Sequence, residues 1–523
     1  MKKQLLFLFS FFLSISGFSQ LRLVAEGPVF PELEGGVGKV LLLKDGTTAY
    51  LAGEKNKYEL RVYGIDHREK YAKQLNLDIP RSTKLETLFE HAGELVLMAN
   101  EIHDKHTALA RFRINLANGA VIERKELMQM PRVQGPAGFA IGFGALASPD
   151  FTIRIDAETD HYAVARFNTL ESDRNKRLEI VHYGPGHKEI GRAYYRSPQQ
   201  KFKYIHFVDL LVMGSDQVFT LVYAYNTKSS GGKEYELLLG SFSSDKKDIE
   251  MIKISAGKEL GFSGGLLKFN PVTKKIFLLS NIMSEDRKGF IPMLVILDPV
   301  SRKVEKSGVA YPGNADNIDK ELFGKRSSFR GLPQNVYINR DGSYTILFEE
   351  IVILQGDKTF TTVLGNAAVV YYDLFGTPMG TYYIPKWHSH DAVTVPTFYL
   401  ANREREFTPF YRGNQFRTLA YLDGNTQSYL LINDLEENVE AWKKGKVEGI
   451  RKVGSTEAYQ FQLAAKQGVP DRSLLFAETG GKRFHQLAVM GVNDFDRKRN
   501  VFVTLKFEKE GRDRGIRLAW FQP

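Results

Sequence analysis

A hairpin signal recurs along the whole chain, in which a short apolar run meets a polar turn and a second short apolar run follows. β-Branched and aromatic residues flank these turns and helical periodicity is weak around them, which favours strands. The repeat therefore predicts an all-β chain built from copies of one unit. The eight hairpins that we count cover residues 40–52, 88–98, 151–167, 207–222, 266–279, 336–348, 416–432 and 473–490.

Three of the turns contain an Asp-Gly pair, at 45–46, 341–342 and 423–424. Tight hairpin turns need positive backbone dihedrals, which glycine adopts without a steric cost. We therefore expect these three hairpins to be the most regular, with a positive φ at each glycine.

A second pair of strand-like runs follows most hairpins, for example residues 58–66 and 69–75. Each unit is then four-stranded, and four antiparallel strands repeated radially give a β-propeller. We predict a single β-propeller domain over residues 20–523, with eight blades by the repeat count. Seven blades is the alternative, because the second half of the seventh unit is weak. The run LRLVAE at 21–26 is expected to close the ring by pairing with the last unit.

The recurring Asp-Gly turn before an aromatic and aliphatic strand, as in LKDGTTAYLAGE (43–54) and NRDGSYTILFEE (339–350), resembles the repeats of uncharacterised secreted bacterial β-propeller proteins. The resemblance extends over most of the chain after residue 19. It implies a fold and a compartment, and it carries no functional residue with it.

The N-terminus has the pattern of a secretory signal peptide over residues 1–19. Lys2 and Lys3 precede an apolar stretch, and Gly17 and Ser19 place small side chains before a cleavage site that leaves Gln20 first. The apolar stretch is shorter than the ~20 residues of a membrane-spanning helix, so a retained anchor is the less favoured alternative. We expect an exported protein, periplasmic or extracellular, with no transmembrane segment after cleavage.

The charge distribution bears on the possible binding partners, and the cysteine content bears on how the fold is stabilised. Removing Lys2 and Lys3 lowers the formal net charge from +10 to +8, and the basic residues are scattered rather than clustered. This pattern predicts a solubilising surface and no nucleic-acid binding. The chain has no cysteine, so its stability must come from burial and not from disulfides.

The longest insertions predict a binding face. In a four-stranded blade, the loops between the second and third strands lie on the same face as the links between blades. Long loops on one face of a compact domain are commonly functional. The insertions that we place there are residues 130–149, 313–334, 349–366, 386–415 and 433–446.

Residues 386–415 interleave aromatic rings with guanidinium groups, a combination that suits protein hot spots and sugar stacking. We predict an exported, non-enzymatic propeller that binds an envelope protein or a glycan through this long-loop face. The alternative function of these aromatic residues is to hold the loop onto the propeller. The candidate binding residues are Trp387, Tyr399, Arg403, Phe410, Tyr411 and Arg412.

His388, His390 and Asp391 form a cluster with metal-ligand chemistry. Alternate residues of an extended strand point the same way, so the two imidazoles would lie together. We otherwise predict no cofactor, with a divalent metal at this cluster as the alternative.

The sequence contains no catalytic motif placed on the strands, helices or turns that the motif requires. A propeller enzyme gathers its residues from several blades, so an enzyme that acts on glycans, or a metal-dependent hydrolase, near the central axis is the alternative function.

Overall fold

The regular structure of the chain is mostly β. The structure, a computed structural model, describes residues 20–523 apart from 33–34, 56, 81–82, 104–105, 131–147, 157, 229–233, 255–261, 284–289, 357–358, 451, 464–466, 478–483 and 512. The predicted signal peptide therefore lies outside the described residues. No helix in the described part of the chain is long and apolar enough to cross a membrane.

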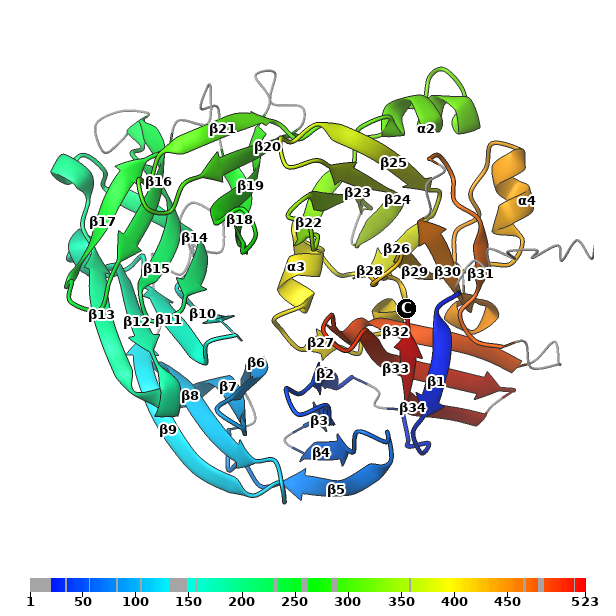
Figure 1. Ribbon diagram of the computed structural model, residues 1–523, viewed down its shortest axis with the longest axis horizontal. Coiled ribbons are helices and arrows are strands. Elements are labelled where there is room, and N and C mark those ends of the chain that lie inside the picture. Colours follow the sequence, from blue (N-terminus) through cyan, green and yellow to red (C-terminus); the bar gives the residue numbers. More distant parts are fainter. Residues whose placement is uncertain are drawn as a thin grey trace, which may run out of the picture.

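Four-stranded antiparallel units surround a common centre, and the first strand of each unit lies nearest that centre (Figure 1). This arrangement confirms the predicted all-β, propeller-type fold. In chain order, the units are β2 (Val37–Leu42), β3 (Thr48–Glu54), β4 (Lys57–Tyr63) and β5 (Glu69–Leu75); β6 (Lys84–His91), β7 (Glu94–His103), β8 (His106–Asn115) and β9 (Val121–Met130); β10 (Asp150–Asp156), β11 (His161–Phe167), β12 (Leu178–Tyr183) and β13 (Glu189–Tyr195); β14 (Tyr204–Met213), β15 (Gln217–Tyr225), β16 (Tyr235–Phe242) and β17 (Asp248–Lys253); β18 (Phe262–Asn270), β19 (Lys275–Met283), β20 (Phe290–Leu297) and β21 (Val304–Val309); β22 (Leu332–Ile338), β23 (Tyr344–Gln355), β24 (Phe360–Tyr372) and β25 (Pro378–Ile384); β28 (Leu419–Asp423), β29 (Ser428–Asp434), β30 (Glu457–Leu463) and β31 (Arg472–Leu474); and β32 (Phe484–Asp496), β33 (Val501–Glu510), β34 (Asp513–Gln522) and β1 (Arg22–Glu26).

Two units share one eight-stranded sheet, because the outer strands β13 and β17 pair in parallel at Tyr194↔Asp248 and Tyr195↔Ile249. Two short strands add to other units. β26 (His388–Asp391) pairs with β24, and β27 (Thr408–Pro409) pairs with β2. The helices are short: α2 (Ala315–Phe323), α3 (Tyr399–Arg403), α4 (Asn438–Lys443), η1 (Arg174–Lys176), η2 (Pro185–His187), η3 (Pro198–Gln200), η5 (Asn414–Phe416) and η6 (Val453–Ser455).

The predicted pairing of the N-terminal run with the last unit is confirmed. β1 pairs antiparallel with β34, from Arg22↔Gln522 to Glu26↔Ala519. Trp520 of β34 is fully buried and donates an indole hydrogen bond to Thr48 Oγ1 of the first unit (3.0 Å). The two ends of the chain are therefore held in one sheet, as closure of a propeller requires.

The core lies between neighbouring sheets rather than within one of them. One buried cluster joins Leu51 of β3 to Leu97 of β7 and Phe112 of β8. Another joins Phe89 of β6 to Tyr162 of β11. Fully burying such a side chain contributes roughly 1.5–3 kcal/mol, so a chain without disulfides has ample stabilisation from these contacts.

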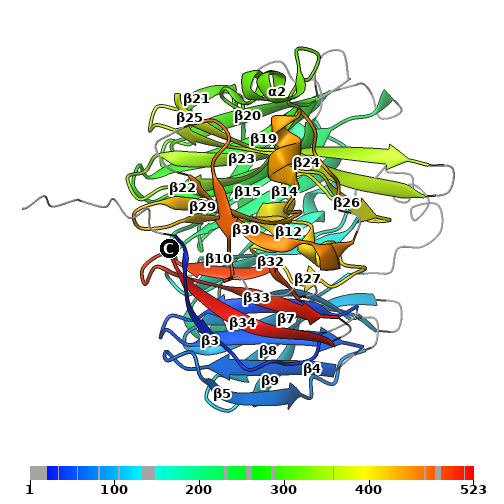
Figure 2. The same cartoon turned by 90° about the vertical axis from the view of Figure 1, so that its right-hand side faces the viewer.

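The chain order defines two faces. First and second strands are joined at the turn face, whereas the links between units lie at the opposite face, called here the connector face. Of residues 349–366, predicted as a loop, 349–355 and 360–366 instead extend the paired strands β23 and β24, which project beyond the other sheets (Figure 2). The β-branched and apolar residues of this segment favour paired strands. The prediction of a loop was based only on the length of the segment.

The eighth predicted hairpin, at 473–490, is not formed. Arg472–Leu474 (β31) pairs with β30, whereas Phe484–Asp496 (β32) pairs forward with β33. The turn that follows β32 contains no glycine. Asn500 adopts the positive φ of 56° in this turn instead. The positive-φ prediction holds for Gly46 (93°) and Gly342 (84°), but Gly424 does not adopt a positive φ. The turn between Asp423 and Ser428 has four residues, one fewer than the turns that contain Gly46 and Gly342, and Gly424 comes directly after the paired residue Asp423.

Candidate functional site

The link between β25 and β28, residues 385–418 and called here the connector, enters the centre of the molecule. It carries α3, which Figure 1 shows inside the ring of sheets, and β27, which pairs with β2 at Val37↔Pro409 and Gly38↔Thr408. Its polar contacts reach the first strands of six units. They are Lys39 Nζ to Arg403 O (3.1 Å) and Glu404 O (2.7 Å), Thr87 Oγ1 to Arg405 O (2.5 Å), Arg405 Nη1 to Asp209 Oδ1 (3.4 Å), Lys268 Nζ to Glu404 Oε2 (3.1 Å), Asn335 Nδ2 to Glu404 Oε1 (2.5 Å) and Thr408 Oγ1 to Gly491 O (2.5 Å).

A fully buried polar cluster anchors the connector to β23 and β24. Lys386 forms an ion pair with Glu349, and both side chains have zero exposure. Lys386 also donates to the carbonyl of Leu364 (3.0 Å), and the Tyr399 hydroxyl donates to Glu349 Oε2 (2.5 Å). Burial lowers the pKa of Lys386 and raises the pKa of Tyr399 well above its ordinary value. These groups fix the start of α3 relative to the sheet.

A cleft of about 380 Å³, called here the central cleft, lies beside the connector on the connector face. Its walls come mainly from the first strands β6, β10 and β14, with Phe167 of β11, Asn402 of α3 and the connector residues Arg405 and Glu406. Such a volume is within the range of pockets that hold small molecules. Three cations and three carboxylates line it: Lys84, Arg154, Arg405, Glu86, Asp150 and Glu406.

Glu86 has the most altered chemistry among these carboxylates. Its side chain is buried, accepts a hydrogen bond from Asn100 Nδ2 (2.7 Å) and forms an ion pair with Lys84 (3.0 Å). Burial raises the pKa of Glu86 to about 7 even though the Lys84 ammonium opposes this, and the charges of Asp150 and Glu406 add to the rise. Glu86 therefore exchanges a proton near neutral pH and can donate or accept a hydrogen bond.

Two arginines share one carboxylate at the other side of the cleft. Arg154 Nη2 lies 2.7 Å and Arg405 Nη1 3.4 Å from Oδ1 of Asp209, which is 1% exposed. Leu267 N–H also donates to Asp209 (2.9 Å). Burial acts to raise the pKa of Asp209, but the two guanidinium groups hold it below its ordinary value. Desolvation, together with the charge of Arg405, lowers the pKa of Arg154 to about 10. One carboxylate cannot neutralise both arginines, so this wall is rich in donors.

The structure separates the six predicted binding residues into two groups. Tyr399 and Phe410 are buried, and Arg403 stacks over the Tyr399 ring at 5.0 Å. These contacts pack the connector, and a binding role for the three residues stays a prediction. The exposed group consists of Trp387, Tyr411 and Arg412, with Trp387 42% and Tyr411 39% exposed and Arg412 over the Tyr411 ring at 5.1 Å.

The two predicted metal-binding histidines lie together on the buried side of β26, and Asp391 is exposed next to them in the chain. His390 Nε2 lies 3.0 Å from the carbonyl of Arg417, and burial lowers the pKa of His390 to about 3. Within the described ranges, no three His, Cys, Asp or Glu side chains are grouped so that they could hold a metal ion. The metal site remains a prediction from the sequence.

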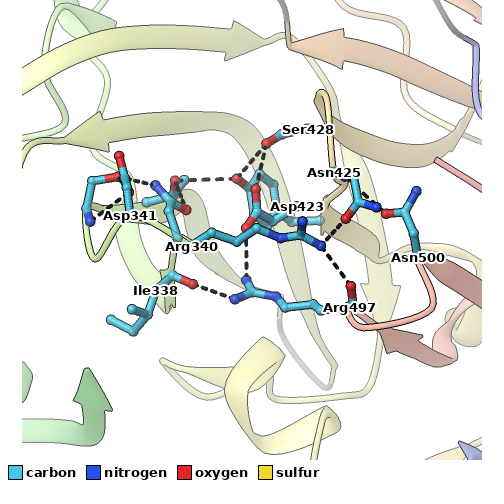
Figure 3. A network of polar contacts seen from close by, with 12 residues as sticks. Ile338, Arg340, Asp341, Asp423, Asn425, Ser428, Arg497 and Asn500 are labelled. Atoms are coloured by element: carbon cyan, nitrogen blue, oxygen red, sulfur yellow. Dashed lines mark hydrogen bonds and ion pairs between the residues drawn. The ribbon is translucent and has the colours of Figure 1, made fainter. Parts of the chain in front are cut away.

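A larger hollow of about 530 Å³ lies on the turn face between the β22–β25 and β28–β31 sheets. Its polar groups are largely occupied by one another (Figure 3). Arg497 pairs with Asp423 (3.3 Å) and donates to the carbonyl of Ile338 (2.5 Å), while Arg340 donates to Asn425 and to the carbonyl of Arg497 (2.8 Å). This network joins the turns of three units, which indicates a structural role, and we assign the candidate site to the central cleft.

Sequence reasoning did not find the cleft, because its residues come from three strands and a distant connector. A weak signal was present. Arg154 and Asp209 are charged residues within the otherwise apolar first strands FTIRI and FVDLLV. A charge at such a position needs a buried partner, and the partners lie far away in the chain.

No family model and no curated protein matches the chain. Among solved structures, the Dos1 propeller is 10% identical, with 95% of this chain and 94% of that chain covered and a TM-score of 0.43. The polysaccharide lyase Uly1 is 8% identical, with coverages of 86% and 91% and a TM-score of 0.38. An alpha-L-arabinanase of Penicillium chrysogenum is 9% identical, with coverages of 63% and 92% and a TM-score of 0.34. The assignment of the fold rests on the strand pairing of the chain itself.

Proposed function

We propose that the protein binds a neutral carbohydrate in the central cleft. The observation that supports this most is the balance of donors and acceptors in one small cleft, where three cations face three carboxylates. Balanced charge disfavours a strongly ionic ligand, whereas hydroxyl groups can donate to the carboxylates and accept from the guanidinium groups. Phe151 and Phe207 add apolar wall to the same cleft, as carbohydrate faces require.

Calorimetric titration of the chain from Gln20 with neutral, acidic and basic oligosaccharides tests this proposal. We expect a neutral oligosaccharide to bind, and we expect Glu86→Gln and Arg405→Gln to weaken it at least about tenfold, because each removes a charged hydrogen bond of roughly 1.5–3 kcal/mol. Glu158→Gln is the matched control, since Glu158 is exposed and pairs with exposed Lys498 on the turn face. Equal affinity in all variants, or no binding by the wild type, would contradict the proposal.

A second candidate function is cleavage of the bound glycan, which the pKa of Glu86 favours. Glycoside hydrolysis commonly uses one carboxylic acid as proton donor and a second carboxylate, and Glu86 and Asp150 line the same cleft. At neutral pH a large share of Glu86 carries a proton. Release of new reducing ends that is lost in both Glu86→Gln and Asp150→Asn would support an enzyme. Binding without product formation would support the non-enzymatic function.

The sequence predicts that the long-loop face binds either a glycan or an envelope protein, and binding of an envelope protein through the connector face is the second of these. The exposed aromatic side chains of Trp387 and Tyr411 and the guanidinium of Arg412 suit such a contact. Affinity capture from cross-linked envelopes with a Trp387→Ala, Tyr411→Ala, Arg412→Ala variant beside the wild type is the test. An identical set of co-purifying proteins would count against it.

We further propose that the four-stranded units are eight blades of one propeller, with the eight-stranded sheet counted as two blades. The domain then spans residues 20–523. Export by the predicted signal peptide, to the periplasm or beyond, completes this proposal. N-terminal sequencing of the protein from envelope and culture fractions tests it, with Gln20 as the expected first residue.

A further inference from the structure

The long hairpin on the connector face has a free edge. β22 pairs with β23 only as far as Leu332↔Glu349, and a bulge follows. Beyond it, residues 351–355 of β23 pair with β24 from Ile351↔Leu364 to Gln355↔Phe360, and β24 pairs with β26 on its other side. No described residue pairs with the outer edge of residues 351–355. Figure 2 shows that this hairpin projects past the neighbouring sheets.

The side chains of this edge are apolar and exposed. Val352, Ile353 and Leu354 are 43%, 55% and 47% exposed, and Phe360 on the facing strand is 36% exposed. An apolar strand edge without charge or proline is a template for pairing with another strand.

The outer edges of other sheets in this protein are protected differently. β5 (EKYAKQL), β9 (VIERKELMQM) and β21 (VEKSGV) each carry lysine or arginine together with glutamate. Such charges prevent edge-to-edge association. Residues 351–355 carry no charge, so this edge lacks the protection that these three edges have.

We propose that this edge pairs antiparallel with the same edge of a second copy of the chain. The partner strand must be extended, apolar and uncharged, because a buried unpaired charge would be costly there. The chain itself supplies such a strand in residues 351–355. A closed two-fold interface is self-complementary, since the same residues meet from both sides.

The geometry of an antiparallel pair fixes the contacts. A two-fold axis normal to the sheet at Ile353 places Ile353 opposite its own copy and Val352 opposite Leu354 of the other copy. Apolar side chains then meet apolar side chains on both faces of the joined sheet. Because each hairpin projects from a connector face, the two connector faces look toward each other. The contact is small, so we expect a dimer that dissociates on dilution.

The absence of cysteine in this chain allows a direct test by cross-linking. Ile353→Cys introduces one thiol at the two-fold axis, where the two Cβ atoms would lie about 4.5–5.5 Å apart. We expect a disulfide-linked dimer under mild oxidation. Val300→Cys is the control: Val300 is 88% exposed in the turn between β20 and β21, and it should cross-link at least about tenfold more slowly.

Sedimentation of the wild type and of charged variants gives the second measurement. Ile353→Lys and Ile353→Glu should each be monomeric, whereas a mixture of the two should recover a dimer because the opposite charges then meet. Both substitutions replace an exposed side chain, and unchanged thermal unfolding would show that the variants fold. A wild type that stays monomeric on concentration, with Ile353→Cys no faster than Val300→Cys, would overturn the proposal. A monomer that captures an extended apolar peptide or a lipid vesicle at this edge would also overturn it.

Discussion

Replacing Lys386 with methionine should strongly destabilise the protein. The Lys386 side chain has zero exposure and holds Glu349, which is equally buried. The methionine side chain would fill much of the same space but would leave the Glu349 carboxylate without its ion partner and the carbonyl of Leu364 without its donor. Removing one partner of a buried ion pair costs about 3–5 kcal/mol, and we expect Lys386→Met to fall in this range.

The double variant Glu349→Gln, Lys386→Met should recover part of this loss. Its neutral glutamine still accepts the hydrogen bond from Tyr399, and the remaining cost is the unpaired Leu364 carbonyl, about 1–3 kcal/mol. The double variant should therefore be more stable than Lys386→Met by roughly 2 kcal/mol, so the two substitutions are not additive. Urea denaturation followed by tryptophan fluorescence measures the free energies of unfolding.

Lys443→Met is the matched control, because Lys443 is 67% exposed and pairs with exposed Glu440. Exposed pairs contribute about 0–1 kcal/mol, so this variant should unfold almost as the wild type does. If Lys386→Met behaved like Lys443→Met, or if the double variant were less stable than Lys386→Met, the buried pair would not anchor the connector as we argue.

Three further outcomes follow from other parts of the molecule. The rings of His91 and His187 are stacked at 4.2 Å. Burial lowers the pKa of His91, and it lowers the pKa of His187 to about 3. Below about pH 6.5 the unfolded chain therefore binds more protons than the folded chain does. Stability should therefore fall as pH drops from about 6.5 toward 3, by up to about 1.4 kcal/mol per pH unit for each histidine, and His187→Asn should flatten the pH dependence of the urea midpoint. Arg497→Leu should cost about 1–3 kcal/mol in the same denaturation assay, since it removes the ion partner of Asp423 and the side-chain donor to the Ile338 carbonyl. Deleting residues 20–26 should expose the edge of β34 and lower the thermal midpoint by several degrees, and a midpoint equal to that of the full chain would show that this strand does not close the fold.

Local signals in the sequence were sufficient for the repeat and its closure. The turn at Asp45 and Gly46 formed as predicted because a tight turn has few backbone solutions. The prediction of a hairpin at 473–490 was wrong because its two strand-like runs pair with different neighbours, β31 with β30 and β32 with β33. The choice of neighbour is made by inter-sheet packing, as between β32 and its partners, and such packing has no local signature.

The candidate site was less predictable for the same reason. His388 and His390 fall on one side of a strand, as the alternation predicts, but the sequence did not indicate that this side is buried. Rings in the connector suggested a binding surface, yet Tyr399 and Phe410 serve its packing. Glu86 is about 320 residues from Arg405 in the chain, and they line one cleft only because the fold brings the connector to the centre.

The buried pair and the cleft are connected through the connector. Desolvating Lys386 and Glu349 is costly, and two well-packed apolar residues could give similar stability. What the pair supplies beyond stability is a single position for α3, because an ion pair and its hydrogen bonds are directional. Arg405 lies two residues after the end of α3, so the position of α3 determines whether its guanidinium reaches Asp209. If the connector were not fixed, ligand binding would have to order it, at a conformational entropy cost of about 1–2 kcal/mol per residue. Apolar replacement of both Lys386 and Glu349 should therefore weaken binding in the cleft more than it weakens the fold.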